Sequence, residues 1–194
     1  MVLSFPLDFC ERLSAHRPGE GSPEVPARRA AVAIIFKAEN QPQILLMRRV
    51  ESPSDPWSGQ ISLPGGRAED GDDGLLATAQ RETREETGLA LEKEARLLCV
   101  MAPLPAVASG KVLAMDITPH VFVLREEVFP CPGEEAEELF WFPLNQIEGG
   151  TMADTHRLDK DGMTLSLPAW RYEGREIWGL THRMVQRLID VVAS

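Results

Sequence analysis

A double glycine followed by an acidic helix constrains this chain more than any other feature. Gly65 and Gly66 end a short apolar segment and lead into a helical stretch that carries Glu82, Glu85 and Glu86. Residues at positions i, i+3 and i+4 project from one face of a helix. The fold must therefore accommodate three carboxylates that stand side by side.

Carboxylates at this spacing repel and raise one another's pKa unless a cation lies among them. Hard divalent cations such as Mg²⁺ take oxygen ligands, and they bridge a few carboxylates to substrate phosphates. The segment therefore indicates part of a metal site that a phosphorylated ligand completes. The competing interpretation is a solvated helix face, on which Arg81 and Arg84 pair with the glutamates; Arg81 and Glu85 have the i,i+4 spacing of such a pair.

Hydrophobic patterning predicts strands interleaved with helices. Strands are expected at 30–36, 43–47, 60–63, 97–101, 117–124, 165–170 and 175–178, and helices at 7–15, 75–87 and 180–192. The turn at 70–74 is expected to cap the second helix, Gly88 to end it, and Leu75, Leu76, Ala79 and Thr83 to form its inner stripe. Residues 103–109 are expected to form a loop. This order predicts an α/β/α sandwich with a mixed β-sheet.

Charge and cysteine content narrow the class of protein. The 194 residues carry a net charge of -10, which argues against binding to polymeric nucleic acid, because such binding needs a basic face. No apolar run approaches the ~18 residues of a membrane span, and no secretion signal is evident. Three widely spaced cysteines, Cys10, Cys99 and Cys131, fit reduced thiols better than disulfides or a zinc site. We therefore expect a cytoplasmic protein that binds neither nucleic acid nor membranes.

The acidic segment resembles the Nudix box. The match covers Arg81, Glu82, Glu85, Glu86, Gly88 and Leu89. Asp72 stands where the box has Glu, eight residues separate it from Arg81, one more than usual, and Thr83 fills an aliphatic position. The Asp and the added residue resemble the coenzyme A pyrophosphatase branch, as do the segments at 45–49 and 57–66. The resemblance covers most of the chain from residue 30, so we expect a Nudix domain at 30–194 and an N-terminal extension at 1–29 that packs on it.

The resemblance implies the same fold and a metal-dependent pyrophosphatase activity. Glu82 and Glu86 would bind Mg²⁺ or Mn²⁺ directly, and Glu85 would share that role. The general base varies among Nudix families and is left open here: Glu82 is one candidate, and a glutamate of the acidic loop is the other. The acidic loop contains Glu134, Glu135, Glu137 and Glu138, and we count Glu85, Glu135 and Glu138 with Glu82 as the catalytic candidates. The alternative for the acidic loop is plain surface charge.

Candidate substrate-binding residues lie on both sides of the double glycine. Arg48, Arg49 and Arg67 can grip phosphates through two parallel hydrogen bonds, although each can equally serve solubility. Gly65 and Gly66 let the backbone approach a phosphate or metal, or simply make a tight turn. A tryptophan just upstream, Trp57, can stack on a base or belong to the core or a lid.

The sequence therefore predicts a hydrolase that cleaves the pyrophosphate bond of a nucleoside diphosphate derivative, with coenzyme A or a close derivative as the first choice. One alternative is a broader enzyme that acts on ADP-ribose, NADH or nucleotide sugars. Another is a Nudix-fold binding module without catalysis, which the retained carboxylates disfavour. Specificity is expected in the loops at 51–59, 103–115 and 149–163. Nudix proteins are often dimers, so a homodimer is compatible with the resemblance.

Overall fold

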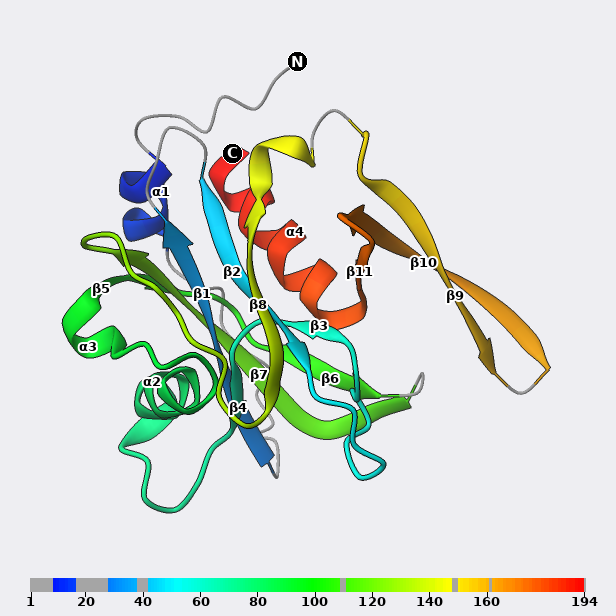
Figure 1. Ribbon diagram of the computed structural model, residues 1–194, viewed down its shortest axis with the longest axis horizontal. Coiled ribbons are helices and arrows are strands. Elements are labelled where there is room, and N and C mark those ends of the chain that lie inside the picture. Colours follow the sequence, from blue (N-terminus) through cyan, green and yellow to red (C-terminus); the bar gives the residue numbers. More distant parts are fainter. Residues whose placement is uncertain are drawn as a thin grey trace.

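The computed structural model describes residues 9–16, 28–37, 42–108, 111–147, 150–160 and 162–193. A central sheet lies between two sets of helices, and a smaller three-stranded sheet extends to one side (Figure 1). None of the helices in these ranges is long and apolar enough to cross a membrane.

The central sheet is mixed, because β1 and β7 run parallel while the other paired strands are antiparallel. Five strands follow the order β3-β2-β1-β7-β5, while β4 pairs with β1, β6 with β7, and β8 with β2. The bounds are β1 Arg28–Lys37, β2 Gln43–Arg49, β3 Ile61–Ser62, β4 Gly65–Arg67, β5 Ala95–Val100, β6 Leu104–Ala108, β7 Lys111–Leu124 and β8 Ala136–Pro143.

Strand β1 separates two apolar layers, because successive side chains of a strand point to opposite faces. Ile34 and Phe36 join the larger core, which includes side chains of α1 (Phe9–Ala15) and α4 (Gly179–Ala193). Ala33 and Ile35 face the smaller core. That side is covered by α2 (Gly74–Thr87) and α3 (Leu91–Glu94) (Figure 1). The α/β/α sandwich with a mixed sheet is thus confirmed.

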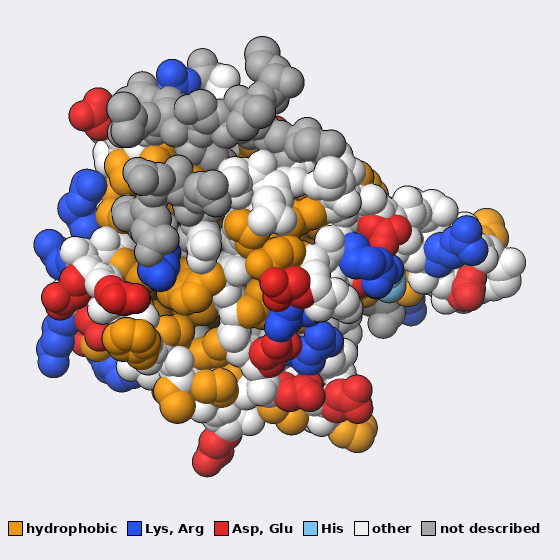
Figure 2. Space-filling model, turned by 45° about the horizontal axis from the view of Figure 1, so that its top comes forward, with side chains coloured by type: hydrophobic (Ala, Val, Ile, Leu, Met, Phe, Trp, Pro, Cys, Tyr) orange, Lys and Arg blue, Asp and Glu red, His pale blue; other side chains and the backbone are white. Residues whose placement is uncertain are grey.

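A second sheet of three strands forms an arm. It consists of β9 (Ala153–Lys160), β10 (Met163–Tyr172) and β11 (Arg175–Trp178), and follows the short 3₁₀ helix η1 (Leu144–Gln146). Phe142 of β8 anchors the arm through ring contacts with Trp170 and Tyr172, at centroid distances of 5.9 and 5.5 Å. The free ends of β9 and β10 project from the body and carry hydrophobic, basic and acidic side chains (Figures 1 and 2).

Several local expectations were wrong. Residues 104–108 form a strand instead of a loop, because the long strand β7 offers them a partner. Most of the expected loop at 149–163 is β9, which pairs along β10. In α2, Leu76 is 37% exposed, and the buried residues are Thr78, Ala79, Thr83, Glu86 and Thr87. Asp73 occupies the N-cap position of α2 without a side-chain capping bond.

The N-terminal extension is described only in part. Helix α1 begins at Phe9, and residues 7–8 of the expected helix lie outside the described residues. Leu13 is fully buried, and the ring of Phe9 lies 5.1 Å from that of Phe36. This described part packs on the domain core. The division of the chain at residue 30 stays a prediction, and β1 already begins at Arg28.

Candidate active site

The double glycine and helix α2 face each other closely. Gly65 has a φ of +145°, and a Cβ added there would lie 2.3 Å from the backbone oxygen of Ala31. A Cβ on Gly66 would lie 2.5 Å from the carboxylate carbon of Glu82. Both positions therefore exclude side chains: Gly65 so that β4 can pair with β1, and Gly66 so that the Glu82 carboxylate can lie against the backbone.

Glu86 is the most buried carboxylate of the site, with 2% of the residue exposed. Its Oε2 accepts a 2.7 Å hydrogen bond from the amide of Gly65. Its buried Oε1 has no hydrogen-bond partner and lies 3.6 Å from Nη1 of Arg49. Burial raises the pKa of Glu86 to about 8, against the opposing effects of the Gly65 amide and Arg49. An orphaned oxygen at this depth is costly unless a cation or donor completes it.

Glu82 and Glu85 differ in their surroundings although both contact Arg81. Glu82 accepts a 3.0 Å hydrogen bond from Nη1 of Arg81, and burial raises its pKa in spite of that arginine. Glu85 is exposed and accepts from the same nitrogen at 3.1 Å, which confirms the expected i,i+4 pair. Glu82 therefore faces the protein interior, whereas Glu85 lies at the outer rim.

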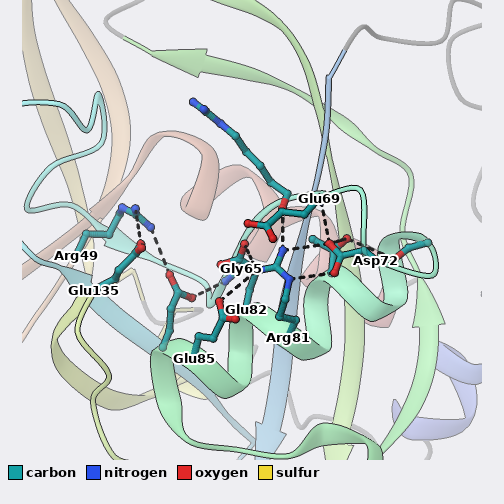
Figure 3. Close-up of polar contacts among 12 residues, drawn as sticks. Arg49, Gly65, Glu69, Asp72, Arg81, Glu82, Glu85 and Glu135 are labelled. Carbon is teal, nitrogen blue, oxygen red and sulfur yellow. Dashed lines mark hydrogen bonds and ion pairs between the residues drawn. The ribbon is translucent and has the colours of Figure 1, made fainter.

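Asp72 holds Arg81 from the other side. Its two oxygens accept hydrogen bonds from Nε and Nη2 of Arg81 at 3.0 and 3.1 Å. Hydrogen bonds from Arg81, the Glu69 amide and Thr78 hold the pKa of Asp72 well below its usual range. Asp72 therefore fixes the arginine that in turn contacts Glu82 and Glu85 (Figure 3).

Arg49, at the end of β2, connects three acidic side chains. Its Nε donates to Asp55 at 2.6 Å, while Nη1 lies 3.6 Å from Glu86 and Nη2 lies 3.6 Å from Glu135. Figure 3 shows Arg49 and Glu135 meeting at one end of the site and Asp72 at the other. Asp55 was not among the predicted residues. In the sequence it is marked only by being an acidic residue shortly after Arg49.

The segment before Glu135 is attached to the end of α2. The amides of Cys131 and Gly133 donate 2.9 Å hydrogen bonds to the carbonyls of Thr87 and Glu86. These bonds satisfy carbonyls that a helix end leaves unpaired. The attachment explains how residues distant in the sequence bring Glu135 to the site.

A cavity of about 370 Å³ opens beside this cluster. Its wall includes Arg49, Gly65, Gly66, Arg67, Glu82 and Glu135 from the predicted set. It also includes Asp55 and Trp57, together with Thr181 and Met184 from α4. The cavity wall therefore combines charged side chains with a larger number of apolar residues, such as Val32, Ile61 and Met115, the usual make-up of a small-molecule site.

Four predicted residues lie outside the cavity wall. Glu86 is one of them, although it contacts Gly65 and Arg49 of the wall. Glu85 is turned to Arg81, as described above. Glu138 pairs with Arg175 of β11, whose Nε lies 3.2 Å from both carboxylate oxygens, and this pairing lowers the pKa of Glu138. Arg48 lies 3.6 Å from Glu138 and 3.5 Å from the carbonyl of Gly59. The structure thus brings Glu135 to the cavity, pairs Glu138 with the arm, and places Arg48 beside Glu138.

The donor set fits a divalent cation that is completed by other oxygens. In the described ranges, no three His, Cys, Asp or Glu side chains form a ready-made metal cage. Mg²⁺, however, is commonly held by one or two carboxylates together with water and substrate phosphates. Glu82 and Glu86 supply two such carboxylates, and the charge of Glu82 helps to raise the pKa of Glu86, an effect that a cation between them would reverse. The orphaned Oε1 of Glu86 is the observation that favours this fit.

Comparison with known proteins places this geometry in a family. The model of the NUDIX domain matches residues 26–165. The chain belongs to the Nudix family. An uncharacterized Nudix hydrolase, NudL, from Yersinia enterocolitica is 31% identical over 189 residues, which cover 95% of this chain and 92% of that protein. A NudL protein from Yersinia pestis is 32% identical over 86% of this chain and 80% of its own length.

Solved structures agree with the Nudix fold. A MutT/nudix family protein from Enterococcus faecalis gives a TM-score of 0.55 at 17% identity, covering 94% of this chain and 73% of its own. An Ap4A hydrolase from C. elegans gives 0.52 at 21% identity, covering 63% of this chain and 85% of its own. This chain is thus a Nudix hydrolase with the expected sandwich.

Proposed function

We propose that this Nudix hydrolase uses Mg²⁺ or Mn²⁺ to cleave the pyrophosphate bond of a nucleoside diphosphate derivative, with coenzyme A or a close derivative as substrate. The observation that carries the proposal is the carboxylate pair Glu82 and Glu86. Glu82 lines the cavity, and Glu86, with its orphaned buried oxygen, contacts Gly65 and Arg49 of the cavity wall. Cleavage of coenzyme A would give 4′-phosphopantetheine and adenosine 3′,5′-bisphosphate. The free cysteines are consistent with a cytoplasmic enzyme.

Glu82 and Glu86 would hold the cation, and Glu85 would join them by releasing Arg81. A bound divalent cation neutralises diphosphate charge and lowers the pKa of a coordinated water. The side chains of Arg49 and Arg67 lie in the cavity wall and would bind the phosphate oxygens that the cation does not bind. Gly66 would let the substrate approach the backbone at the point where Glu82 already does.

Glu135 is our candidate for the general base. It lies in the cavity wall on a segment attached to α2, and its side chain is 70% exposed, so that it can accept a proton from water near the substrate. Glu82 is the alternative, but its proposed contact with the cation would leave it less free to act as a base. Glu138 already accepts a hydrogen bond from Arg175, so we assign it a structural role and no contact with the substrate.

The substrate part of the proposal rests on sequence. Asp72 and the longer spacing to Arg81 resemble the coenzyme A pyrophosphatase branch. In the structure, the aspartate makes two hydrogen bonds to Arg81.

A panel of pyrophosphate compounds tests the proposal. Coenzyme A, ADP-ribose, NADH and nucleotide sugars are incubated with Mg²⁺ or Mn²⁺, and products are identified by mass. We expect coenzyme A to be cleaved with the highest kcat/KM, EDTA to abolish turnover, and Glu86→Gln to remove nearly all of it with the fold intact. Glu126→Gln, at an exposed position, is the control. Full activity of Glu86→Gln or in EDTA would contradict the metal assignment.

A further inference from the structure

A second cavity, of about 210 Å³, lies under the arm. Residues from β6, β9, β10, β11 and the start of α4 form its wall. Trp57, Gln60 and Leu180 belong to the walls of both cavities. The two cavities are therefore neighbours, and the second lies beyond these three residues as seen from the carboxylates of the first.

The wall of the second cavity is mostly aliphatic and aromatic. Val107, Leu158, Leu167 and Pro168 contribute aliphatic surface, and Trp57 and Trp178 contribute rings. This composition suits a ligand that gains by leaving water, and offers little to a group that needs several hydrogen bonds.

Few polar groups of that wall are available to a ligand. The indole nitrogen of Trp57 already donates to the carbonyl of Val107 at 3.1 Å. The ring of His182 lies 4.0 Å from that of Trp170, and burial lowers the pKa of His182. Arg183 belongs to the wall and is exposed. The wall therefore offers a phosphate one guanidinium group, that of Arg183.

Hydrogen bonds connect the wall between the two cavities to the charged side chains of the first cavity. Asp55 accepts hydrogen bonds from the amide of Trp57 at 3.0 Å and from Arg49 at 2.6 Å. The position of Trp57 is thereby fixed relative to the arginine that would bind phosphate. A substrate held at its diphosphate would thus have a defined route past Trp57.

We propose that the second cavity binds an aliphatic acyl or alkyl group at the far end of the substrate's non-nucleotide half. The inference rests on the proposed function for the position of the diphosphate, and on the second cavity itself for the class of ligand. A nucleobase fits this wall less well, because its edge would find few free hydrogen-bonding partners. Each methylene buried there should lower KM about two- to fourfold.

A chain-length series tests this assignment. KM is measured for coenzyme A and for its acetyl, butyryl and hexanoyl thioesters, with the wild type, Leu167→Trp and Val107→Phe. We expect KM to fall stepwise with chain length in the wild type, and the trend to vanish in both variants while KM for coenzyme A is unchanged. Leu165→Trp, two residues away on β10 and 41% exposed, is the control. Melting temperatures verify that each variant is folded.

Calorimetric binding of S-hexanoyl-pantetheine, which lacks the nucleotide and the diphosphate, separates the two proposals. If no thioester is hydrolysed but this compound binds the wild type and not Val107→Phe, the second cavity is assigned correctly and the substrate proposal fails. A flat KM series without such binding overturns the inference. It is also overturned if the variants raise KM for coenzyme A as much as for its thioesters, because the occupant would then be the nucleotide half.

Discussion

At the scale of single residues, the absence of a side chain at Gly66 matters as much as the carboxylates that are present. An added Cβ would meet the Glu82 carboxylate, which is the movable end of a side chain, instead of backbone. Gly66→Ala should therefore displace Glu82 and leave the fold in place. We expect kcat/KM to fall at least tenfold, with a melting temperature close to that of the wild type.

Gly71→Ala is the matched control, because nothing lies within 4 Å of a Cβ added there. Steady-state kinetics and thermal melting of both variants decide the matter. Equal activity of Gly66→Ala and Gly71→Ala would show that the contact between Gly66 and Glu82 is not used in catalysis.

The acidic loop offers a second prediction at this scale. Glu135 lies in the cavity wall near Arg49, whereas Glu134 and Glu137 are exposed outside it. We expect Glu135→Gln to lower kcat about 10²-fold, the scale of general-base catalysis, with metal affinity kept. Glu134→Gln and Glu137→Gln should turn over like the wild type. If Glu135→Gln does so as well, Glu82 becomes the base, and a loss of metal affinity would make Glu135 a ligand.

Single residues were predictable where a local rule applied. The pair of Arg81 and Glu85 follows from helical spacing, and the structure confirms it. The contact of Glu138 with Arg175, by contrast, joins β8 to β11 across 37 residues of sequence. No local pattern encodes such a partner, so Glu135 and Glu138 were both counted as catalytic candidates, although Glu135 lines the cavity and Glu138 pairs with Arg175.

At the scale of elements, helix α2 and the segment 131–133 form one unit. A Cβ on Gly133 would lie 1.9 Å from the backbone oxygen of Glu85, so Gly133→Ala must push the segment away from the helix. The amides of Cys131 and Gly133 would then lose their carbonyl partners. We expect Gly133→Ala to cost about 2–3 kcal/mol in the free energy of unfolding, by analogy with overpacked interiors and lost hydrogen bonds.

Because Glu135 lies only two residues after Gly133, the same change should also lower kcat. Urea denaturation and kinetics of Gly133→Ala and Gly71→Ala provide the measurement and its control. Wild-type stability in Gly133→Ala would mean that the segment yields freely and does not position Glu135.

The same scale shows why some elements could be predicted and others could not. Helices α2 and α4 begin and end within about one residue of the expected bounds, because periodic apolar positions are a local signal, as is the glycine that ends α2. Strands β6 and β9 were expected as loops. The sequence of β6 contains Pro105, and that of β9 contains several charged residues. Each exists because a longer neighbour, β7 or β10, offers a hydrogen-bonded edge. Such pairing is a property of the whole sheet.

At the scale of the whole molecule, net charge and substrate charge have the same sign. A protein with net charge -10 gives no general attraction to a diphosphate, so affinity must arise locally. Arg49 and Arg67 supply part of the positive charge in the cavity wall, and the proposed cation would supply the rest. Without the cation, Arg49 and Arg81 are the positive groups that contact Glu82, Glu86 and Glu135.

This balance makes global stability depend on pH in a direction set by Glu86. In the folded protein, this residue keeps its proton up to about pH 8, whereas an unperturbed glutamate has a pKa of 4.5. Between these values the folded state binds more protons than the unfolded state, so the free energy of unfolding falls as pH rises. The slope approaches about 1.4 kcal/mol per pH unit for a single group.

In EDTA, the wild type should therefore lose about 2 kcal/mol more than Glu86→Gln between pH 6.5 and pH 8.5, since glutamine does not titrate. Urea denaturation of both proteins at the two pH values measures this difference, and Glu126→Gln should follow the wild type. Saturating Mg²⁺ should remove the excess loss, because a cation at Glu82 and Glu86 favours the ionised carboxylate. Parallel losses in EDTA would show that Glu86 is already ionised at neutral pH. A loss that Mg²⁺ leaves unchanged would place the cation elsewhere.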